Sequence, residues 1–122
     1  MLKRAALDPS LLAQFTGSEQ PYRHGFVRDI VFTEGVKYVA DTTGTYWLLD
    51  EIALAQKFQR AVMTVEFQVW ELTVAADRSA VLACSDRDGH EVFSKRIKWT
   101  DFSTPSIRLY VSNGTILLPS EY

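Results

Sequence analysis

The chain is short of the residues from which several common kinds of site are built. Its single cysteine, Cys84, cannot form an internal disulfide, which fits a reducing compartment. Its two histidines, His24 and His90, lie far apart and have no cysteine pair beside them, so the spacing typical of a zinc site is missing. No Gly-rich phosphate loop, nucleophile elbow or metalloprotease helix is present. We therefore expect no cofactor and no metal.

The chain also lacks an excess of charge of either sign and any long hydrophobic run. Lysine and arginine number 13 against 15 aspartates and glutamates, which gives a net charge of −2 with no basic tail or stripe. Nucleic-acid binding, which depends on clustered basic side chains, is therefore disfavoured. No stretch is long enough to cross a membrane, and the segment before Pro9 is too short for a signal peptide. We expect a cytoplasmic protein without membrane contact.

The sequence does contain enough apolar material for one core. Its 122 residues suit a single domain over residues 1–122, and 47% of them are hydrophobic against 23% charged. A domain of this size buries about two-thirds of the surface that its unfolded chain exposes. It needs neither disulfides nor a metal ion to fold.

The most apolar segment begins at Tyr46, and we predict a helix over about 46–60. Asp50 and Lys57 lie about two turns apart and form one narrow charged strip on this helix. Asp50 and Glu51 project about 100° apart, so they cannot form a side-by-side acid pair. The most buried stripe is predicted to consist of Leu48, Ile52 and Ala55.

Two further elements are predicted in the first half of the chain. A short N-terminal helix runs from Pro9 to Gln14 or Phe15, with Asp8 as its N-cap. Residues 29–33 and 36–40 are β-prone and are separated by Glu34 and Gly35, which predicts a hairpin.

The second half of the chain is rich in predicted strands. Residues 63–74 form a long one, whose apolar residues change parity near Val69 and Trp70, which predicts a bulge. Asn113 and Gly114 are a strong hairpin signal, because both central residues of a type I′ turn need positive φ. The other predicted strands cover residues 80–85, 92–99, 107–111 and 115–118, with turns at 77–79 and 86–89. The predicted fold is α+β, a single antiparallel sheet with the helix of about 46–60 packed on one face and the short N-terminal helix beside it.

Four polar residues are the candidates for a catalytic or binding site. His24 lies in a predicted loop, where binding residues concentrate, and imidazole can act as acid or base near neutral pH. Asp41 and Asp101 lie near predicted strand ends. They could form a site with Asp50 only if the fold places the three carboxylates close together. The structural alternatives are a capping or solvent-facing role for His24 and a solvated helix strip for Asp50.

The segment Asp86-Arg87-Asp88-Gly89 resembles part of a calcium loop. It lacks the third acidic position and the distal glutamate of an EF-hand, and it lies between two predicted strands. A plain hairpin turn is the favoured interpretation.

Seven short segments carry a sequence resemblance: residues 15–19, 22–24, 32–36, 46–50, 67–72, 100–102 and 118–122. In this order along the chain, they resemble an uncharacterised family of small bacterial proteins, a domain of unknown function that is frequent on plasmids and other mobile elements. The resemblance runs from about Leu11 to Tyr122. One departure is Ser103, where the family usually has proline after Thr-Asp-Phe. The resemblance implies a bacterial, cytoplasmic, single-domain accessory factor and transfers no catalytic residue.

The leading interpretation of function is a non-enzymatic protein-interaction or accessory module of a bacterial or mobile-element system. We expect it to form a homodimer, because the chain has many aromatic residues and a long antiparallel sheet with edges to protect. One alternative is a small-ligand-binding protein or hydrolase with a site around His24 and the nearby carboxylates. The other is a nucleic-acid-binding accessory protein.

Overall fold

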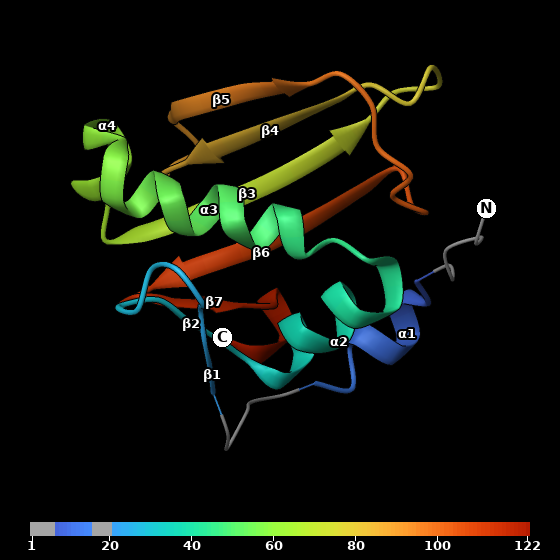
Figure 1. The fold of residues 1–122 in the computed structure, drawn as a ribbon, viewed down its shortest axis with the longest axis horizontal. Helices are drawn as coiled ribbons and strands as arrows, with labels where there is room; N and C mark the ends of the chain where they lie inside the picture. Colours follow the sequence, from blue (N-terminus) through green and yellow to red (C-terminus); the bar gives the residue numbers. More distant parts are fainter. Residues whose placement is uncertain (1–6, 16–20) are drawn as a thin grey trace.

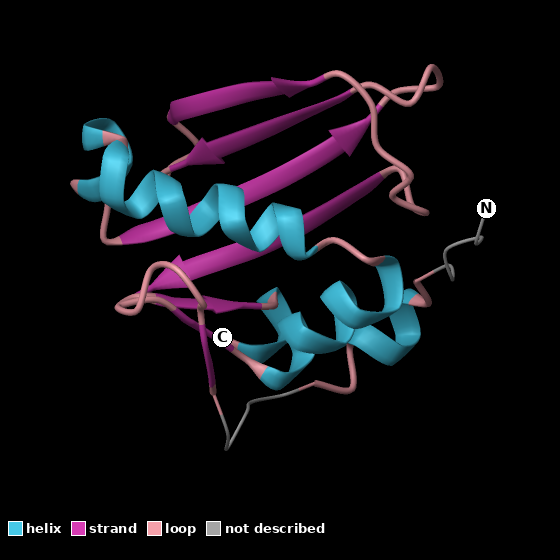
Figure 2. Ribbon diagram, in the orientation of Figure 1, coloured by secondary structure: helices cyan, strands magenta, loops and turns pink. Residues whose placement is uncertain are grey.

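The computed structural model describes residues 7–15 and 21–122. One sheet of seven strands has helix α3 lying across one of its faces, while α1 and α2 lie beside the sheet's shorter strands (Figure 1; Figure 2). Within these residues, no helix has both the length and the apolar character that a membrane crossing requires. The elements are α1 (Pro9–Leu12), β1 (Tyr22–Arg23), β2 (Val31–Phe32), α2 (Glu34–Thr43), α3 (Tyr46–Phe58), α4 (Arg60–Met63), β3 (Phe67–Val74), β4 (Ala80–Ser85), β5 (Glu91–Ile97), β6 (Ser106–Ser112), β7 (Thr115–Leu117) and the 3-10 helix η1 (Pro119–Glu121).

The α+β class is confirmed, but the sheet is mixed and not purely antiparallel as predicted. The strand order is β1-β2-β7-β6-β3-β4-β5, and β2 pairs with β7 in parallel, with Val31 opposite Thr115. The other pairs are antiparallel. The difference arises because β2 leads into a helix and not into a hairpin, so its second neighbour comes from the far end of the chain.

The predicted hairpin of residues 29–33 and 36–40 is wrong, because residues 36–40 lie in α2. Thr33 is the N-cap of this helix, and its hydroxyl accepts a hydrogen bond from the N–H of Val36 at 3.3 Å. Val36, Val39 and Ala40 are buried, which is the spacing of one helix face. The β-branched residues suggested a strand, but the cap and this spacing favour a helix.

The prediction for α3 is confirmed, with its end at Phe58 and a separate short helix, α4, after it. Leu48, Ile52 and Ala55 are all buried. Asp50, however, does not simply face solvent with Lys57, because it contacts His24 from the β1–β2 loop.

The predicted bulge near Val69 and Trp70 is also wrong. β3 keeps one register along both neighbouring strands, and the irregularity lies instead between Cys84 and Ser85, where β4 meets β5. The apparent change of parity arises because a polar residue, Gln68, takes a core position in β3.

The turn predictions are confirmed. Asn113 and Gly114 join β6 to β7 with φ of 52° and 72°. The N–H of Ser10 donates to Asp8 Oδ1 at 3.0 Å, so Asp8 caps α1, although this helix ends at Leu12, before the predicted end.

Candidate functional site

Two of the four candidate residues, His24 and Asp50, meet in the structure. His24 is 4% exposed, and its Nε2 lies 2.8 Å from Asp50 Oδ1. Its Nδ1 accepts hydrogen bonds from the N–H groups of Phe26 at 3.1 Å and Val27 at 3.0 Å. Because Nδ1 is an acceptor, we assign the ring hydrogen to Nε2, which donates to Asp50. Nδ1 therefore stabilises the turn within the β1–β2 loop, and Nε2 holds this loop against α3, which is a structural, capping role.

The other two candidates have different surroundings. Asp41 lies in α2, and its carboxylate accepts hydrogen bonds from Lys37 Nζ at 2.6 Å and from the hydroxyl of Tyr46. These hydrogen bonds, that from Lys37 first, hold the pKa of Asp41 below its usual value. Asp101 lies in the loop after β5 and lines a hollow together with Trp99. The structure thus does not gather all four residues into one site.

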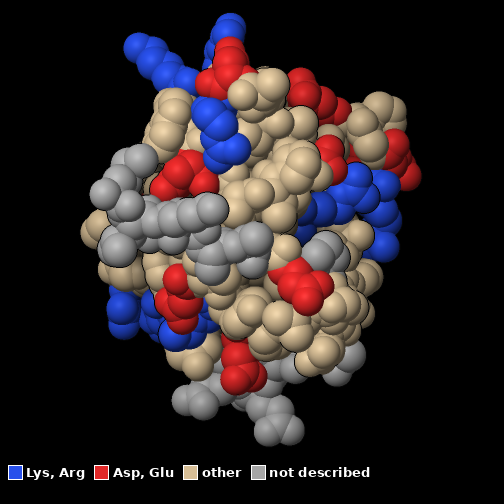
Figure 3. All heavy atoms as spheres, turned by 90° about the vertical axis from the view of Figure 1, so that its right-hand side faces the viewer, with Lys and Arg blue, Asp and Glu red and all other residues tan. Residues whose placement is uncertain are grey.

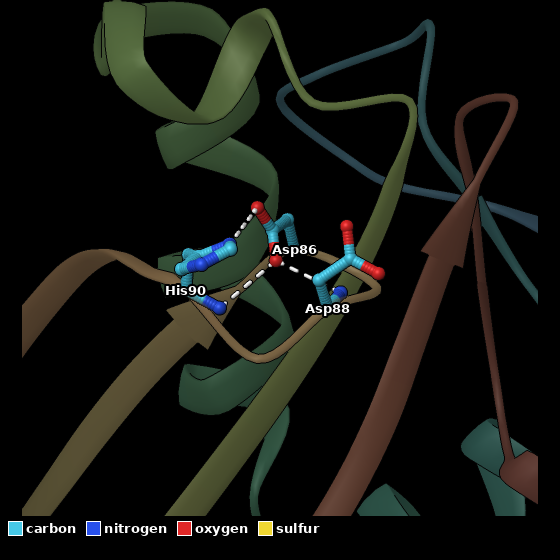
Figure 4. A group of neighbouring side chains, drawn as sticks. All are labelled: Asp86, Asp88 and His90. Atoms are coloured by element: carbon cyan, nitrogen blue, oxygen red, sulfur yellow. Dashed lines mark hydrogen bonds and ion pairs between the residues drawn. The ribbon is translucent and has the colours of Figure 1, made fainter.

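The turn between β4 and β5 gathers Asp86, Asp88 and His90 (Figure 4). Each can offer one ligand atom, and these atoms lie within 4.8 Å of one another. Asp86 Oδ1 accepts hydrogen bonds from the N–H groups of Asp88 and His90, each at 2.9 Å, and the bond from His90 contributes most to lowering the pKa of Asp86. Figure 4 shows the Asp88 carboxylate turned away from these bonds. The arrangement is that of an Asp-stabilised turn.

An open groove runs between helix α3 and the edge strand β5. A hollow of about 500 Å³ at one end is lined by Trp47, Glu51, Lys95 and Trp99, among others. A hollow of about 230 Å³ at the other end is again lined by Glu51 and Lys95. Because these two residues line both hollows, the hollows adjoin each other and form one groove, which the Glu51 and Lys95 side chains divide. We call it the α3–β5 groove and define it by Trp47, Glu51, Leu54 and Phe58 on the helix and Phe93, Lys95 and Trp99 on the strand side.

Large apolar side chains are exposed along the α3–β5 groove. Phe58 is 68% exposed, Trp99 is 58% exposed and Leu54 is 39% exposed. Phe93, on β5, is half-buried. Burying such a side chain against a partner would stabilise the complex by about 25 cal/mol for each Å² of apolar area removed from water. Helix α3 and the β5 edge of the sheet thus expose apolar side chains that are not buried in the core.

One ion pair crosses the middle of the groove. Lys95 Nζ donates to both carboxylate oxygens of Glu51, at 2.8 and 2.9 Å. The side chains of Lys95 and Glu51 are 47% and 29% exposed, so the pair contributes only about 0.2–1 kcal/mol to stability. Its main effect is to hold two long side chains across the groove and so to separate its two ends.

Charged residues of both signs line the larger hollow. Lys98, exposed just after β5, is one of the basic ones. Glu51 and Asp101 are the acidic residues that line the larger hollow. Figure 3 looks toward the end of β5 and shows basic side chains projecting at the top of the molecule, with acidic ones beside them.

Sequence reasoning missed this groove, although two signals point to it. Lys95 interrupts the apolar alternation of Phe93, Ile97 and Trp99. The helix is also apolar on more of its circumference than one sheet contact can cover, because Leu54 and Phe58 stay exposed. Which part of the sheet the helix leaves open depends on the tertiary packing, and the sequence pattern does not contain it.

A third hollow, of about 490 Å³, lies where the N-terminal and C-terminal segments approach β6. Its lining includes Leu12, Ile107 and Leu118. Ser120 Oγ donates to the carbonyl of Leu12 at 3.0 Å, which ties the two segments together. The ionisable residues that line it, Glu71 and Arg108, pair with each other at 3.1 Å. We interpret this hollow as a junction between packed segments.

Comparison with known proteins agrees with the sequence resemblance. Residues 8–122 match a family described as "Family of unknown function (DUF6876)". Neither a curated protein nor a solved structure matches the chain. The matched range includes every helix and strand of the described residues. The chain therefore belongs to DUF6876, a family of unknown function.

Proposed function

We propose that this protein is a non-enzymatic interaction module that binds another polypeptide in the α3–β5 groove. One observation carries the proposal: Leu54, Phe58 and Trp99 expose large apolar side chains along a single groove. Exposed apolar surface that is gathered in one place and edged by polar groups is typical of protein-interaction sites. The sequence resemblance favours an accessory role in a bacterial or mobile-element system.

The surroundings of the candidate catalytic residues also support a binding role. A general base needs a ring nitrogen or carboxylate within reach of a substrate. In His24, Nδ1 accepts two backbone hydrogen bonds and Nε2 faces Asp50. Asp41 is held by Lys37 and Tyr46 on the surface of α2. A hydrolase built on these groups would have to break the contacts that hold the β1–β2 loop and the end of α2.

The proposal is tested by site-specific crosslinking in cells that naturally produce the protein. Phe58 is replaced by a photo-crosslinking phenylalanine analogue, and Val81 on the open face of the sheet serves as the matched control because it is also exposed. We expect a crosslinked polypeptide at position 58 and not at position 81. An adduct of twice the chain's mass would identify a second copy as the partner, as a homodimer requires. Equal crosslinking at both positions, or none at 58, would contradict the proposal.

A further inference from the structure

We infer that the turn over residues 24–27, in the β1–β2 loop, is an acid-sensitive switch: when the His24 ring takes up a second proton, the backbone amides that it holds are released. The loop lies beside α3 (Figure 1) and is not part of the α3–β5 groove. Three features of the structure support the switch: the hydrogen bonds of the two ring nitrogens, the burial of the ring, and the charged groups around it.

The neutral ring of His24 holds the turn closed. Its Nδ1 accepts hydrogen bonds from the N–H groups of Phe26 at 3.1 Å and Val27 at 3.0 Å. Two donors directed at one nitrogen require a lone pair on it, so the ring hydrogen is on Nε2, which lies 2.8 Å from Asp50 Oδ1. Because His24 is only 4% exposed, little water reaches these bonds. The closed turn therefore needs the neutral ring.

A second proton on the ring is incompatible with this turn. It would bind to Nδ1, since Nε2 already carries a hydrogen, and a protonated nitrogen donates and no longer accepts. The N–H groups of Phe26 and Val27 would then face a third N–H, and both would lose their acceptor. The contact of Nε2 with Asp50 would become an ion pair. Protonation thus weakens the attachment of the ring to its own loop and strengthens its attachment to α3.

The charged surroundings of the ring are simple. One carboxylate, that of Asp50 on α3, contacts the ring, and its side chain is 43% exposed. The neighbouring parts of the sheet, β2 and the Asn113-Gly114 turn, contain no charged residue. Arg23 donates to the carbonyl of Arg28, and Glu51 pairs across the groove, so these groups have other partners. The further charged residues of the loop and of α3 are Asp29 and Lys57.

Opening of the turn would change the surface of the domain. Phe26 is 73% exposed at the tip of the loop, whereas Val27 beside it is 7% exposed and belongs to the core. The N–H of His24 donates to the carbonyl of Ile30 at 2.9 Å, which keeps the two ends of the loop together. Acid would therefore expose Val27 and move Phe26 without unfolding the domain.

NMR spectroscopy of the whole protein tests the switch between about pH 8 and 5, where histidine side chains usually change charge. The ring nuclei of His24 report its protonation, and hydrogen exchange of the Phe26 and Val27 amides reports the turn. We expect the protection of these two amides to fall about five-fold or more as the ring becomes charged, because each lost hydrogen bond changes the equilibrium about two- to ten-fold. The amide of Leu72, in the central strand β3, should keep its protection.

Three variants separate the ring's proton from other effects of acid. His24→Asn is the matched variant, because the asparagine Oδ1 can accept from the same two amides and takes up no proton. Its turn should stay protected over the whole range. His90→Asn changes an exposed histidine and should leave the pH dependence as it is. Asp50→Asn should move the opening to lower pH, because the charged ring loses its ion-pair partner.

The switch is overturned by any of three results. The first is a His24 ring that stays neutral down to about pH 5. The second is a charged ring with undiminished protection of the Phe26 and Val27 amides. The third is an equal loss of protection in His24→Asn. The first two are measured on the unaltered protein, so they decide the question even where a variant does not fold.

Discussion

Single buried polar residues decide how parts of this chain pack. Gln68 is 3% exposed, and its Nε2 donates to the carbonyl of Val62 at 3.0 Å. Its Oε1 accepts hydrogen bonds from Trp70 Nε1 at 2.9 Å and from Gln56 Nε2 at 2.7 Å. The amide thus joins β3, α3 and the end of α4, and its buried polar atoms are satisfied. A buried glutamine looks like a surface residue in a pattern of apolar positions, which explains why the bulge prediction at Val69 was wrong.

Cys84 should be chemically inert in the folded protein. The thiol is fully buried, and burial, followed by the charge of Asp86, raises its pKa to about 12. The reactive thiolate is therefore almost absent at pH 8. We expect no reaction with a thiol reagent such as Ellman's reagent under native conditions, and full reaction in guanidinium chloride. Rapid reaction of the native protein would contradict the burial of this strand.

Asp41 should make stability depend on pH in the acid range. Its pKa is lowered in the fold, so its contribution is complete above the usual value of 3.8 and is lost as the pH falls through the folded value. Asp41→Asn should cost about 0.5 kcal/mol at pH 7, because the pair with Lys37 is exposed, and nothing at about pH 2. Urea unfolding at several pH values measures this. Asp29→Asn, at an exposed loop position, is the control; a pH-independent loss for Asp41→Asn would refute the assignment.

At the scale of elements, the C-terminal segment stabilises the start of α2. The Glu121 carboxylate accepts hydrogen bonds from the Thr33 hydroxyl at 2.6 Å, from the Leu118 N–H at 2.9 Å and from the Gly35 N–H at 3.3 Å. A negative group at this position also interacts favourably with the helix dipole. Residues 32–36 and 118–122, two of the segments that carry the sequence resemblance, are therefore in contact. The hydrogen bonds between them explain why these residue types occur there.

A side chain at position 35 should destabilise this junction. An added Cβ would lie 2.7 Å from Leu118 Cδ1 and 2.9 Å from Glu121 Cδ. Gly to Ala within a helix usually stabilises by about 0.5–1 kcal/mol, so the expected loss of about 1–3 kcal/mol has the opposite sign. Thermal and urea unfolding of Gly35→Ala measure it. Gly25→Ala, which meets nothing within 4 Å, should change stability by less than about 0.5 kcal/mol. A stabilised Gly35→Ala variant would mean that η1 does not pack there.

Local patterns predicted the elements whose cause is local. The repeated apolar residues of α3, the Asn113-Gly114 turn and the Asp8 cap all lie within a few residues of the structure that they determine. The parallel pairing of β2 with β7 depends on contacts between distant segments, so no local pattern contained it. In α2, Val36 and Val39 suited a strand or a helix, and the Thr33 cap together with the helical spacing of the buried residues separates the two. The groove depends on how α3 is placed on the sheet, and could not be predicted for the same reason.

At the scale of the whole molecule, the C-terminal end of the chain and the β4–β5 turn are joined on the open face of the sheet. The Arg87 guanidinium lies 4.2 Å from the centre of the Phe67 ring and donates to the Tyr122 hydroxyl at 2.9 Å. Phe67, Tyr110 and Tyr122 pack together with ring centres 4.8 to 5.9 Å apart. The β4–β5 turn is thus tied to the C-terminal segment. The side of the domain opposite α3 has an aromatic cluster of its own.

The parallel pairing of β2 with β7 has a consequence for synthesis on the ribosome. Val31 and Phe32 meet their β7 partners, Thr115 and Ile116, only after almost all of the chain has been made. Until then, the apolar residues of α2 have no C-terminal segment to cover them. Contacts between such distant residues slow folding, and apolar surface that stays uncovered during translation is a target for chaperones. We expect the four antiparallel strands β3 to β6 to form first and the N-terminal third of the chain to join them last.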